Sequence, residues 1–337
     1  MCHELPTLAE SGSEPGFHPA EWLQPARVGS VPRRRPRPPC VGAVIPYAPP
    51  MPLHRLVDDL PPLQEPVLIA SFDGWVDAAE AASTAVGLLA AEGTMVATFD
   101  PDAIFDYRSR RPVLDVMDGR LSALHWPEFA IRHAEIDDRD LLVFTGAEPD
   151  LRWRELADDV AGLCNQLGVA QWISIGSVPG AVAHTMPVPV MTTASEDDLL
   201  APGTARGPEG LLRVPSAVLS ALEMAVSATG IPSVGFFAQV PPYASIGYAA
   251  ASIALLERVA AHLGIHIPME GLHEEERDQL ARYDAAVRSD AMLKQTVEQL
   301  ETVAGSIDEE QLPSGDDLAR EIQRFLRGQT DAPEADG

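Results

Sequence analysis

From residue 66 onward the sequence alternates short apolar runs with longer amphipathic stretches, and this alternation restricts the fold more than any other feature. Apolar runs bounded by Gly, Pro or Asp are typical of buried strands, and apolar residues spaced three and four apart are typical of helices. Strands joined by helices form right-handed crossovers in one sheet. The sequence therefore predicts an α/β fold, a three-layer α/β/α sandwich with a mostly parallel sheet. The predicted strands are residues 67–71, 94–99, 121–126, 129–136, 141–145, 172–175, 188–194 and 233–239, and the predicted helices are 76–91, 153–167, 217–228 and 247–263.

Turn and cap residues add local predictions to this pattern. Residues 121–126 and 129–136 are expected to pair as a hairpin around Pro127. Residues 176–180 are expected to form a loop after the strand at 172–175. Ser216 is expected to cap the helix that follows it.

The chain divides into four predicted segments. Residues 1–60 form a Pro- and Arg-rich extension, since 15 of the 31 prolines lie in the first 66 residues. Such a segment has little to bury and is predicted to be disordered. It is either a basic arm that touches an acidic partner or an upstream extension, with folded sequence beginning near Met51. Residues 61–268 are the predicted α/β core, 269–328 a C-terminal helical extension, and 329–337 a disordered tail.

The helical extension carries a narrow apolar stripe. Helices are predicted at residues 272–287, 291–303 and 316–326. In the second of these, apolar residues recur at helical spacing, which predicts that the helix buries one side against its own core or against a second subunit. The stripe consists of Leu293, Val297, Leu300 and Val303.

Charge and cysteine content exclude several classes of function. The formal net charge is -26, with 50 acidic against 24 basic residues, and such a surface repels nucleic-acid phosphates. The sequence shows no membrane span and no secretory signal, which favours a cytoplasmic protein. Cys2, Cys40 and Cys164 form no metal or disulfide pattern, and Cys164 is interpreted as a buried small hydrophobe.

Polar residues follow several predicted strands and form candidate pocket residues. Ligands bind beyond the carboxyl ends of strands in open α/β sheets, so these loops are where a site is expected. Asp77 is also suited to cap the next helix, and the arginines at 108, 110 and 111 are suited to pair with nearby acids and order the loops. A general base needs a partner that orients it, and none is evident for the histidine of these loops. The pocket candidates are Asp77, Asp106, Arg108, Glu148 and His184.

Motifs for phosphate and metal binding do not occur in the sequence. There is no Walker-type loop, no G-x-G-x-x-G after a strand and no H-E-x-x-H. Ser177 lacks the spacing of a nucleophile elbow, and the acidic run 196–198 is interpreted as a solvated helix start. No cofactor and no metal are therefore predicted.

Short loop motifs occur in a combination that is specific although each piece is weak. They are Gly-Trp-Val-Asp-Ala at 74–78, Phe-Asp-Pro-Asp at 99–102, Asp-Tyr-Arg-Ser-Arg-Arg-Pro at 106–112, Gly-Ala-Glu-Pro-Asp at 146–150, Ala-His-Thr at 183–185 and Val-Pro-Pro-Tyr at 240–243. Together they make residues 60–328 resemble the proteasome assembly chaperone 2 family, especially its actinobacterial branch. The resemblance implies a fold similar to nucleoside phosphorylases, assembly into homo-oligomers and a role in building proteasomes. Archaeal relatives dock through a C-terminal hydrophobic-Tyr-any tail, which residues 335–337 do not match.

Two main functions follow from these observations. The first is a protein-binding, chaperone-like module that is not an enzyme; it predicts an exposed apolar patch and self-association through the helices after residue 270. The alternative is a small-molecule hydrolase or transferase of nucleosidase-like fold, which predicts that Asp77, Arg108, Glu148 and His184 converge. A third possibility is an assembly scaffold without a dedicated client.

Overall fold

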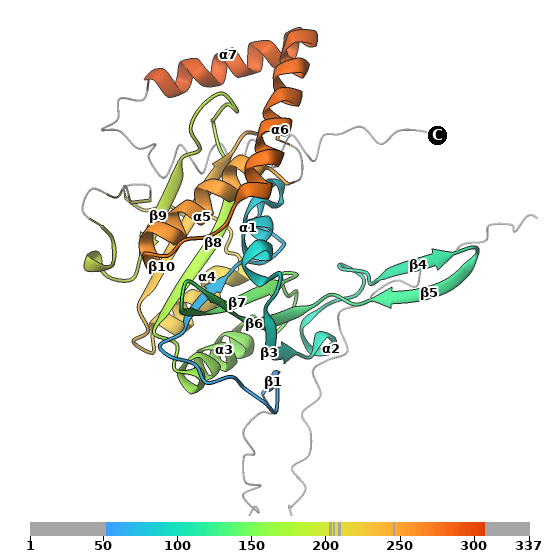
Figure 1. Cartoon of the computed structure of the whole chain (residues 1–337), viewed down its shortest axis with the longest axis vertical. Helices are drawn as coiled ribbons and strands as arrows, with labels where there is room; N and C mark the ends of the chain where they lie inside the picture. The colour runs from blue at the N-terminus through green and yellow to red at the C-terminus, as the bar shows by residue number, and fades with distance from the viewer. Residues whose placement is uncertain (1–51, 202–203, 205, 208–209, 245–246, 307–337) are drawn as a thin grey trace, which may run out of the picture. The chain divides into compact units, whose positions relative to one another are not determined.

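An eight-stranded sheet lies at the centre of the computed structural model, which describes residues 52–306 apart from 202–203, 205, 208–209 and 245–246 (Figure 1). The strand order is β1-β3-β6-β7-β2-β8-β10-β9. The strands are β1 (His54–Leu56), β2 (Val67–Ala70), β3 (Thr94–Phe99), β6 (Phe129–Ile136), β7 (Arg139–Gly146), β8 (Gln171–Pro179), β9 (Val190–Ala194) and β10 (Ser233–Val240).

The strand directions give the sheet a parallel centre with antiparallel flanks. β2 pairs in parallel with β7 and β8, and β8 pairs in parallel with β10. β3 runs the same way, because it is antiparallel to β6, which is antiparallel to β7. β1, β6 and β9 run in the opposite direction. The sheet is therefore mixed, and most of its strands share one direction, as predicted.

Alternate residues of the central strands supply two separate cores. Leu68 and Ala70 of β2 belong to the core under α3 (Trp153–Leu167) and α4 (Val218–Ser227). Val67 and Ile69 belong to the core under α1 (Ala81–Ala90) and α5 (Ala249–Leu263). Successive side chains of a strand point to opposite faces, so a run of buried apolar residues serves both cores. This arrangement confirms the predicted three-layer α/β/α sandwich.

Helix α3 begins and ends at the predicted residues. Its inward residues include Leu156, Val160 and Leu167, and the helix ends at Gly168, whose φ of 67° is the left-handed conformation that favours glycine. Cys164 lies on the same buried side, and burial raises the pKa of its thiol to about 12. The thiolate is therefore disfavoured, and Cys164 acts as a small hydrophobic residue, as predicted.

Strand β8 is longer than predicted. The predicted loop at 176–180 continues the strand through Pro179, because Gly176 and Ser177 pair with Phe237 and Ala238 of β10. Glycine and proline suggested a turn, but a neighbouring parallel strand supplies the hydrogen bonds that keep the chain extended.

A two-stranded hairpin projects from the rest of the fold (Figure 1), and it replaces the hairpin predicted around Pro127. β5 (Arg120–His125) pairs with β4 (Val113–Met117), whereas β6 pairs with β3 and β7. The turn is Asp118-Gly119, with φ values of 50° and 76°, which match a two-residue type I′ turn. The prediction was wrong because Pro127 separates two strands with different partners. We call residues 113–126 the arm.

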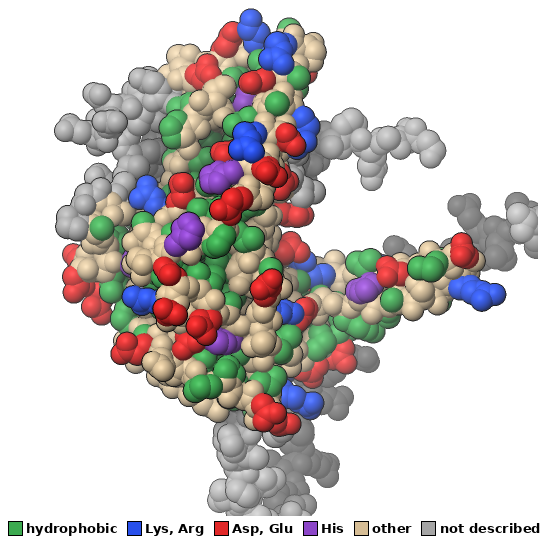
Figure 2. Space-filling view, viewed as in Figure 1, with side chains coloured by type: hydrophobic (Ala, Val, Ile, Leu, Met, Phe, Trp, Pro, Cys, Tyr) green, Lys and Arg blue, Asp and Glu red, His purple; other side chains and the backbone are tan. Residues whose placement is uncertain are grey.

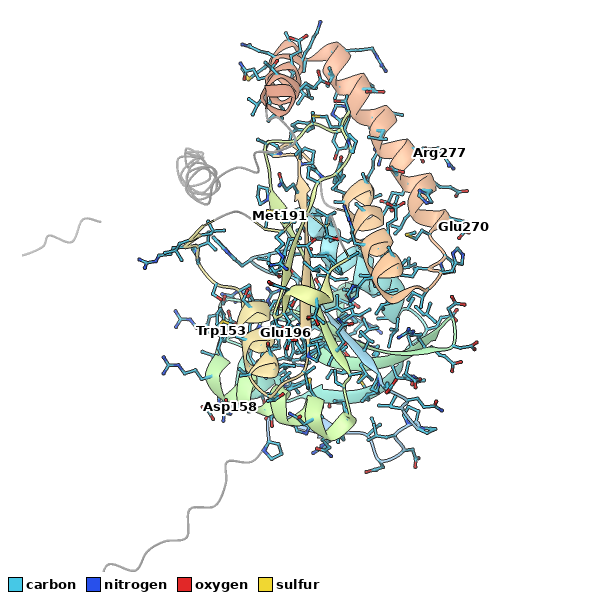
Figure 3. The ribbon with its side chains drawn as sticks, turned by 90° about the vertical axis from the view of Figure 1, so that its left-hand side faces the viewer. Trp153, Asp158, Met191, Glu196, Glu270 and Arg277 are labelled. Atoms are coloured by element: carbon cyan, nitrogen blue, oxygen red, sulfur yellow. The ribbon has the colours of Figure 1, made fainter. Side chains whose placement is uncertain are left out.

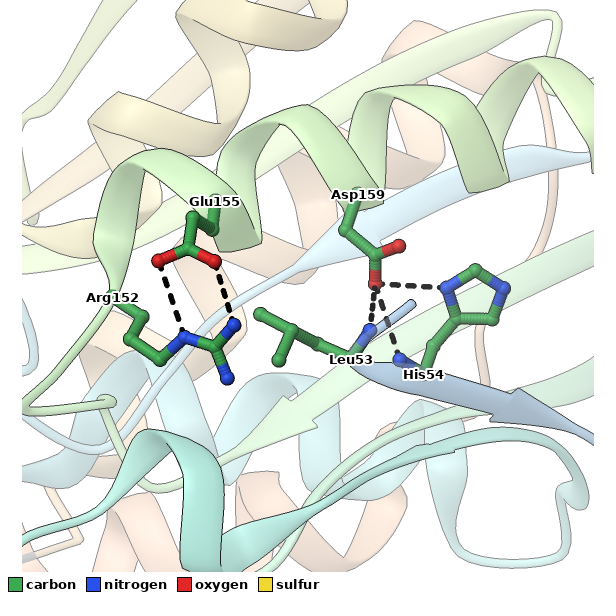
Figure 4. A network of polar contacts seen from close by, with 5 residues as sticks. All are labelled: Leu53, His54, Arg152, Glu155 and Asp159. Atoms are coloured by element: carbon green, nitrogen blue, oxygen red, sulfur yellow. Dashed lines mark hydrogen bonds and ion pairs between the residues drawn. The ribbon is translucent and has the colours of Figure 1, made fainter. Parts of the chain in front are cut away.

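Strand β1 lies within the segment that was predicted to be a disordered extension. Its residues pair with β3, and Asp159 of α3 anchors it (Figure 4). Asp159 Oδ2 accepts hydrogen bonds from the backbone N–H groups of Leu53 and His54, both at 3.1 Å, and lies 2.8 Å from His54 Nδ1. Folded sequence therefore begins before residue 60, because an acid far along the chain fixes this short strand. The rest of the predicted extension, residues 1–51, lies outside the described residues.

Two long helices follow α5, as predicted. α6 (Glu270–Ser289) packs on α5, and α7 (Ala291–Ser306) packs on α6. Figure 3 marks α6 by the labels Glu270 and Arg277, and it marks α3 by the labels Trp153 and Asp158. Val297 of the apolar stripe is buried within its own chain, and Thr185 donates a hydrogen bond to Glu301 Oε1 at 2.6 Å. The stripe is thus at least partly covered without a second subunit. The predicted helix at 316–326 and the tail lie outside the described residues.

Asp159→Ala is expected to lower the free energy of unfolding by about 2 kcal/mol, because it leaves the amides of Leu53 and His54 without their acceptor. Urea denaturation measures the loss, and amide hydrogen exchange reports whether it begins at β1. The control is Asp158→Ala, which removes a neighbouring exposed acid. Equal effects of the two substitutions would contradict the anchoring role of Asp159.

Candidate functional site

A cavity of about 980 Å³ lies at the carboxyl ends of the parallel strands β2, β8 and β10. The loop after β2, residues 74–79, forms one wall, and residues 212–217, which lead into α4, form another. Edge strand β9 contributes Met191, which Figure 3 labels, and Thr193. This edge of an open α/β sheet is where ligands bind in many folds. The cavity lies where the sequence pattern predicted a site.

Apolar side chains make up most of the cavity wall. Trp75, Met191 and Phe237 line it, together with valines and prolines from the strand ends. The Phe237 ring fits because Gly176 and Gly235 have no side chain. A Cβ on Gly176 would lie 2.6 Å from Phe237 Cδ1, and a Cβ on Gly235 would lie 2.7 Å from Phe237 Cε2. These two glycines therefore let an aromatic ring form part of the wall.

Asp77 is the buried acid of the cavity wall, with 8% of its surface exposed. Its Oδ1 accepts hydrogen bonds from the backbone N–H groups of Ala82 at 2.9 Å and Ser83 at 3.1 Å, at the start of α1. Oδ2 is shielded and accepts no hydrogen bond from the described residues. Burial raises the pKa of Asp77, and the hydrogen bonds from Ser83 and Ala82 offset this only in part. The residue caps a helix, as predicted, but half of its carboxyl group has no partner there.

The backbone next to Asp77 is strained. Ala79 and Glu80 have φ values of 53° and 52°, a left-handed conformation that is uncommon for residues with a side chain. Contacts from the neighbouring strand and loop hold them: Ser177 Oγ donates to the carbonyl of Ala78 at 2.9 Å, and Gly247 N–H donates to the carbonyl of Ala79 at 2.7 Å. Strained backbone kept in place by tertiary contacts is concentrated at functional sites.

Glu148 joins three segments beside the cavity. Its Oε2 accepts a hydrogen bond from Trp75 N–H at 2.9 Å, and its Oε1 accepts one from Val218 N–H at 2.7 Å. Glu148 therefore caps α4, which corrects the prediction for Ser216, whose hydroxyl instead donates to the carbonyl of Ala217. Gly74 leaves room for this carboxylate, since a Cβ there would lie 2.3 Å from Glu148 Oε2.

One arginine pairs with an acid after β2, and acids after β3 and β7 accept hydrogen bonds from backbone N–H groups. Arg110 donates to Asp73 Oδ2 at 2.7 Å and to the Asp73 carbonyl at 3.1 Å. Asp106 Oδ1 accepts from Arg108 N–H at 2.9 Å, and Asp106 N–H donates to Asp150 Oδ2 at 3.0 Å. These contacts order the loops, and Arg108 lies exposed on the turn that they form.

His184 lies in a cluster of tyrosines beside α6. Its side chain is 2% exposed, and its Nδ1 lies 2.7 Å from the hydroxyl of Tyr243. Its Nε2 is 3.5 Å from Asp284 Oδ1, a separation that allows an ion pair but not a well-formed hydrogen bond. The ring also contacts Tyr283 at a centroid distance of 5.4 Å. His184 thus connects a loop to a helix and is not among the residues that line the cavity.

The predicted pocket residues do not form one catalytic group. No hydrogen bond or ion pair joins any two of Asp77, Arg108, Glu148 and His184, and of these four Asp77 alone lines the cavity. Within the described part of the chain, no group of three or more His, Cys, Asp or Glu is placed to hold a metal ion. None of the described helices is both long and apolar enough to span a membrane.

Sequence reasoning missed the arm and the apolar character of the cavity. Asp118-Gly119 between apolar residues is the strongest short hairpin signal, and it would have located the arm. The cavity wall comes from segments far apart in the sequence, such as Trp75, Met191 and Phe237, so no local pattern marks it.

Comparison with known proteins gives a family match. The sequence model described as the PAC2 family matches residues 71–287. A Mycobacterium tuberculosis protein of unknown function is 29% identical, with a TM-score of 0.69, over 85% of this chain and 94% of that one. A proteasome-assembly chaperone homologue from M. tuberculosis is 31% identical, with a TM-score of 0.63, over 68% and 99% of the two chains. A PAC2 family protein from Streptomyces avermitilis is 31% identical, with a TM-score of 0.60, over 65% and 95%. No curated protein matches.

Asp77→Asn is expected to remove a pH dependence of stability. The folded-state pKa of Asp77 is raised above its usual value of 3.8, so the folded chain holds the proton more tightly than the unfolded chain does. The stability of the wild type relative to Asp77→Asn should therefore fall as pH rises from 3.8 through the folded-state pKa and then level off. Thermal unfolding across this range measures the difference. A difference that stays constant or grows with pH would contradict the raised pKa.

Glu148→Gln is expected to destabilise the fold by about 1–3 kcal/mol. An amide has one oxygen, so its NH₂ group must face either Trp75 N–H or Val218 N–H, and a backbone donor loses its acceptor. Chemical denaturation measures the loss. Glu155→Gln is the control, because Glu155 is an exposed acid that pairs with Arg152. A Glu148→Gln variant as stable as the control would show that the carboxylate does not hold these segments.

Proposed function

The chain belongs to the PAC2 family, and we propose that it is a chaperone-like module that binds other protein chains through its arm. The exposure of the arm carries this proposal. Every residue of β4 and β5 is exposed, including Met117 at 67% and Leu121 at 74% (Figure 2 shows apolar side chains along the projecting hairpin). The other large exposed apolar residues of the arm are Val113, Leu114, Val116, Leu124 and Trp126.

The apolar surface of the arm is unfavourable in water when no partner covers it. Two isolated strands are marginally stable in water, and contiguous exposed apolar surface marks sites of protein association. Among the described residues β4 and β5 pair only with each other, so each strand has an edge that no other described strand covers and whose backbone groups are available to an added strand. We infer that the arm takes up an extended apolar segment of its client by backbone pairing and side-chain contact.

Proteasome subunits are the first clients to test. One relative with 31% identity is described as a proteasome-assembly chaperone homologue. An archaeal proteasome activator from Pyrococcus furiosus is 16% identical with a TM-score of 0.53, which supports the shared fold alone. We include self-association and a cytoplasmic location in the proposal, and a second copy of the chain is then a competitor for the same arm.

The enzyme alternative has weaker support. The Glu148 carboxylate is occupied by two backbone donors, and His184 is buried against tyrosines. A general acid or base must reach the reacting atoms, and neither residue lines the cavity. Binding therefore accounts for these residues better than catalysis does.

The double substitution Met117→Asp with Leu121→Asp is expected to weaken client binding at least about tenfold, because it places charges within the apolar contact. The measurement is capture of purified proteasome α-subunits, followed by native mass spectrometry. The matched control is Met224→Asp with Met292→Asp, which adds the same charge at residues that are 75% and 78% exposed outside the arm. Native mass spectrometry of the chain alone reports whether the arm variant also loses self-association.

Two results would count against the proposal. One is that the wild-type chain captures no α-subunit and remains a monomer. The other is that the arm variant and its control bind equally well, which would place the contact elsewhere on the surface.

A further inference from the structure

We propose that the cavity at the carboxyl ends of β2, β8 and β10 binds a small, mostly apolar molecule that carries one hydrogen-bond donor, which Asp77 accepts. The arm does not line this cavity, so the proposal goes beyond the proposed protein-binding function. The cavity volume of about 980 Å³ lies at the upper end of the range for small-molecule sites, about 300–1,000 Å³.

The lining of the cavity defines the body of the ligand. Trp75 and Phe237 present aromatic surface, and Met191 adds a flexible apolar side chain. Binding sites for small molecules combine mostly apolar walls with a few placed polar groups. A flat aromatic or short aliphatic body would bury the apolar surface of these side chains without leaving polar groups unpaired.

The polar end of the ligand is defined by Asp77. Both backbone donors within its reach bind Oδ1, so Oδ2 has no hydrogen-bond partner among the described residues. A buried acceptor without a partner is costly, and a ligand hydroxyl, amine or ring N–H would satisfy it. Oδ2 is shielded, so neighbouring side chains of the cavity wall must shift to let a ligand donor reach it, while the carboxyl group keeps its two bonds to the backbone.

The surroundings of Asp77 keep it in place for this role. Hydrogen bonds from Ser177 and Gly247 hold the strained loop that follows Asp77, and the two bonds to Oδ1 fix the carboxyl group. A group that is held before binding loses little freedom when a ligand arrives. The same geometry makes the Asp77→Asn variant informative. Its oxygen must stay on the two backbone donors, so its NH₂ group replaces Oδ2 and meets a ligand donor.

The first test is binding of N-phenyl-1-naphthylamine, an apolar fluorescent probe with one N–H donor. Fluorescence should rise with the full-length wild-type chain. Thr193→Trp should weaken this binding at least tenfold, because Thr193 is exposed at the cavity and an indole there occupies the space. Met224→Trp is the control, since it adds an indole on the exposed side of α4. Thermal unfolding confirms that both variants are folded.

The arm offers another apolar surface, so the variant Met117→Asp with Leu121→Asp is tested with the same probe. It should bind the probe like the wild type. No fluorescence rise with the wild type, or equal binding by Thr193→Trp and Met224→Trp, would overturn the cavity as the site. Loss of probe binding in the arm variant, with probe binding retained in Thr193→Trp, would also overturn the cavity as the site.

The second test addresses the donor and uses displacement of the probe. Indole should displace it about fivefold better than 1-methylindole does from the wild type, because only indole donates a hydrogen bond. Asp77→Asn should lose this preference. Equal displacement by the two compounds from the wild type, or a preference that persists in Asp77→Asn, would overturn the assignment of Asp77. These outcomes leave the protein-binding proposal unaffected.

Discussion

The carboxylate of Glu148 organises the edge of the sheet where the cavity lies. Its two oxygens accept from Trp75 N–H and Val218 N–H, so one side chain fixes the loop after β2, the end of β7 and the start of α4. A charged acceptor forms hydrogen bonds stronger than a neutral one does, and the N-terminus of a helix favours negative charge. Trp75 and residues 212–217, both in the cavity wall, are therefore positioned by the same group.

Elements with strong local signals could be predicted from the sequence. β3 and α3 have the predicted bounds, since each combines a clear period with a glycine at its boundary. The antiparallel flanks of the sheet were harder to predict. β6 and β7 join through Asp137-Asp138, whose φ values are 55° and 61°, and no glycine marks this turn. Partner choice between strands depends on tertiary packing, which periodicity does not report.

The candidate site was predictable in position but not in composition. The rule that ligands bind at strand ends selected both Asp77, which lines the cavity, and Glu148, which does not line it but holds two neighbouring segments. It did not indicate that Glu148 would be occupied by backbone donors or that His184 would lie under α6. Side-chain type suggests chemistry, whereas burial and hydrogen-bond partners decide whether that chemistry is available.

The distribution of charge is consistent with the proposal that the chain binds its partners through the arm. With a formal net charge of -26, two copies of the chain or an acidic client are repelled over most approaches. The arm departs from this pattern, because Asp115 pairs with His125 at 2.7 Å and Arg120 lies beside the turn at Asp118. Seven of its exposed side chains are large and apolar, so contact there buries apolar surface at a small electrostatic cost. If the chain binds its clients as proposed, repulsion elsewhere would direct association to the arm, so that an acidic surface and an apolar projection would together restrict how another chain can approach.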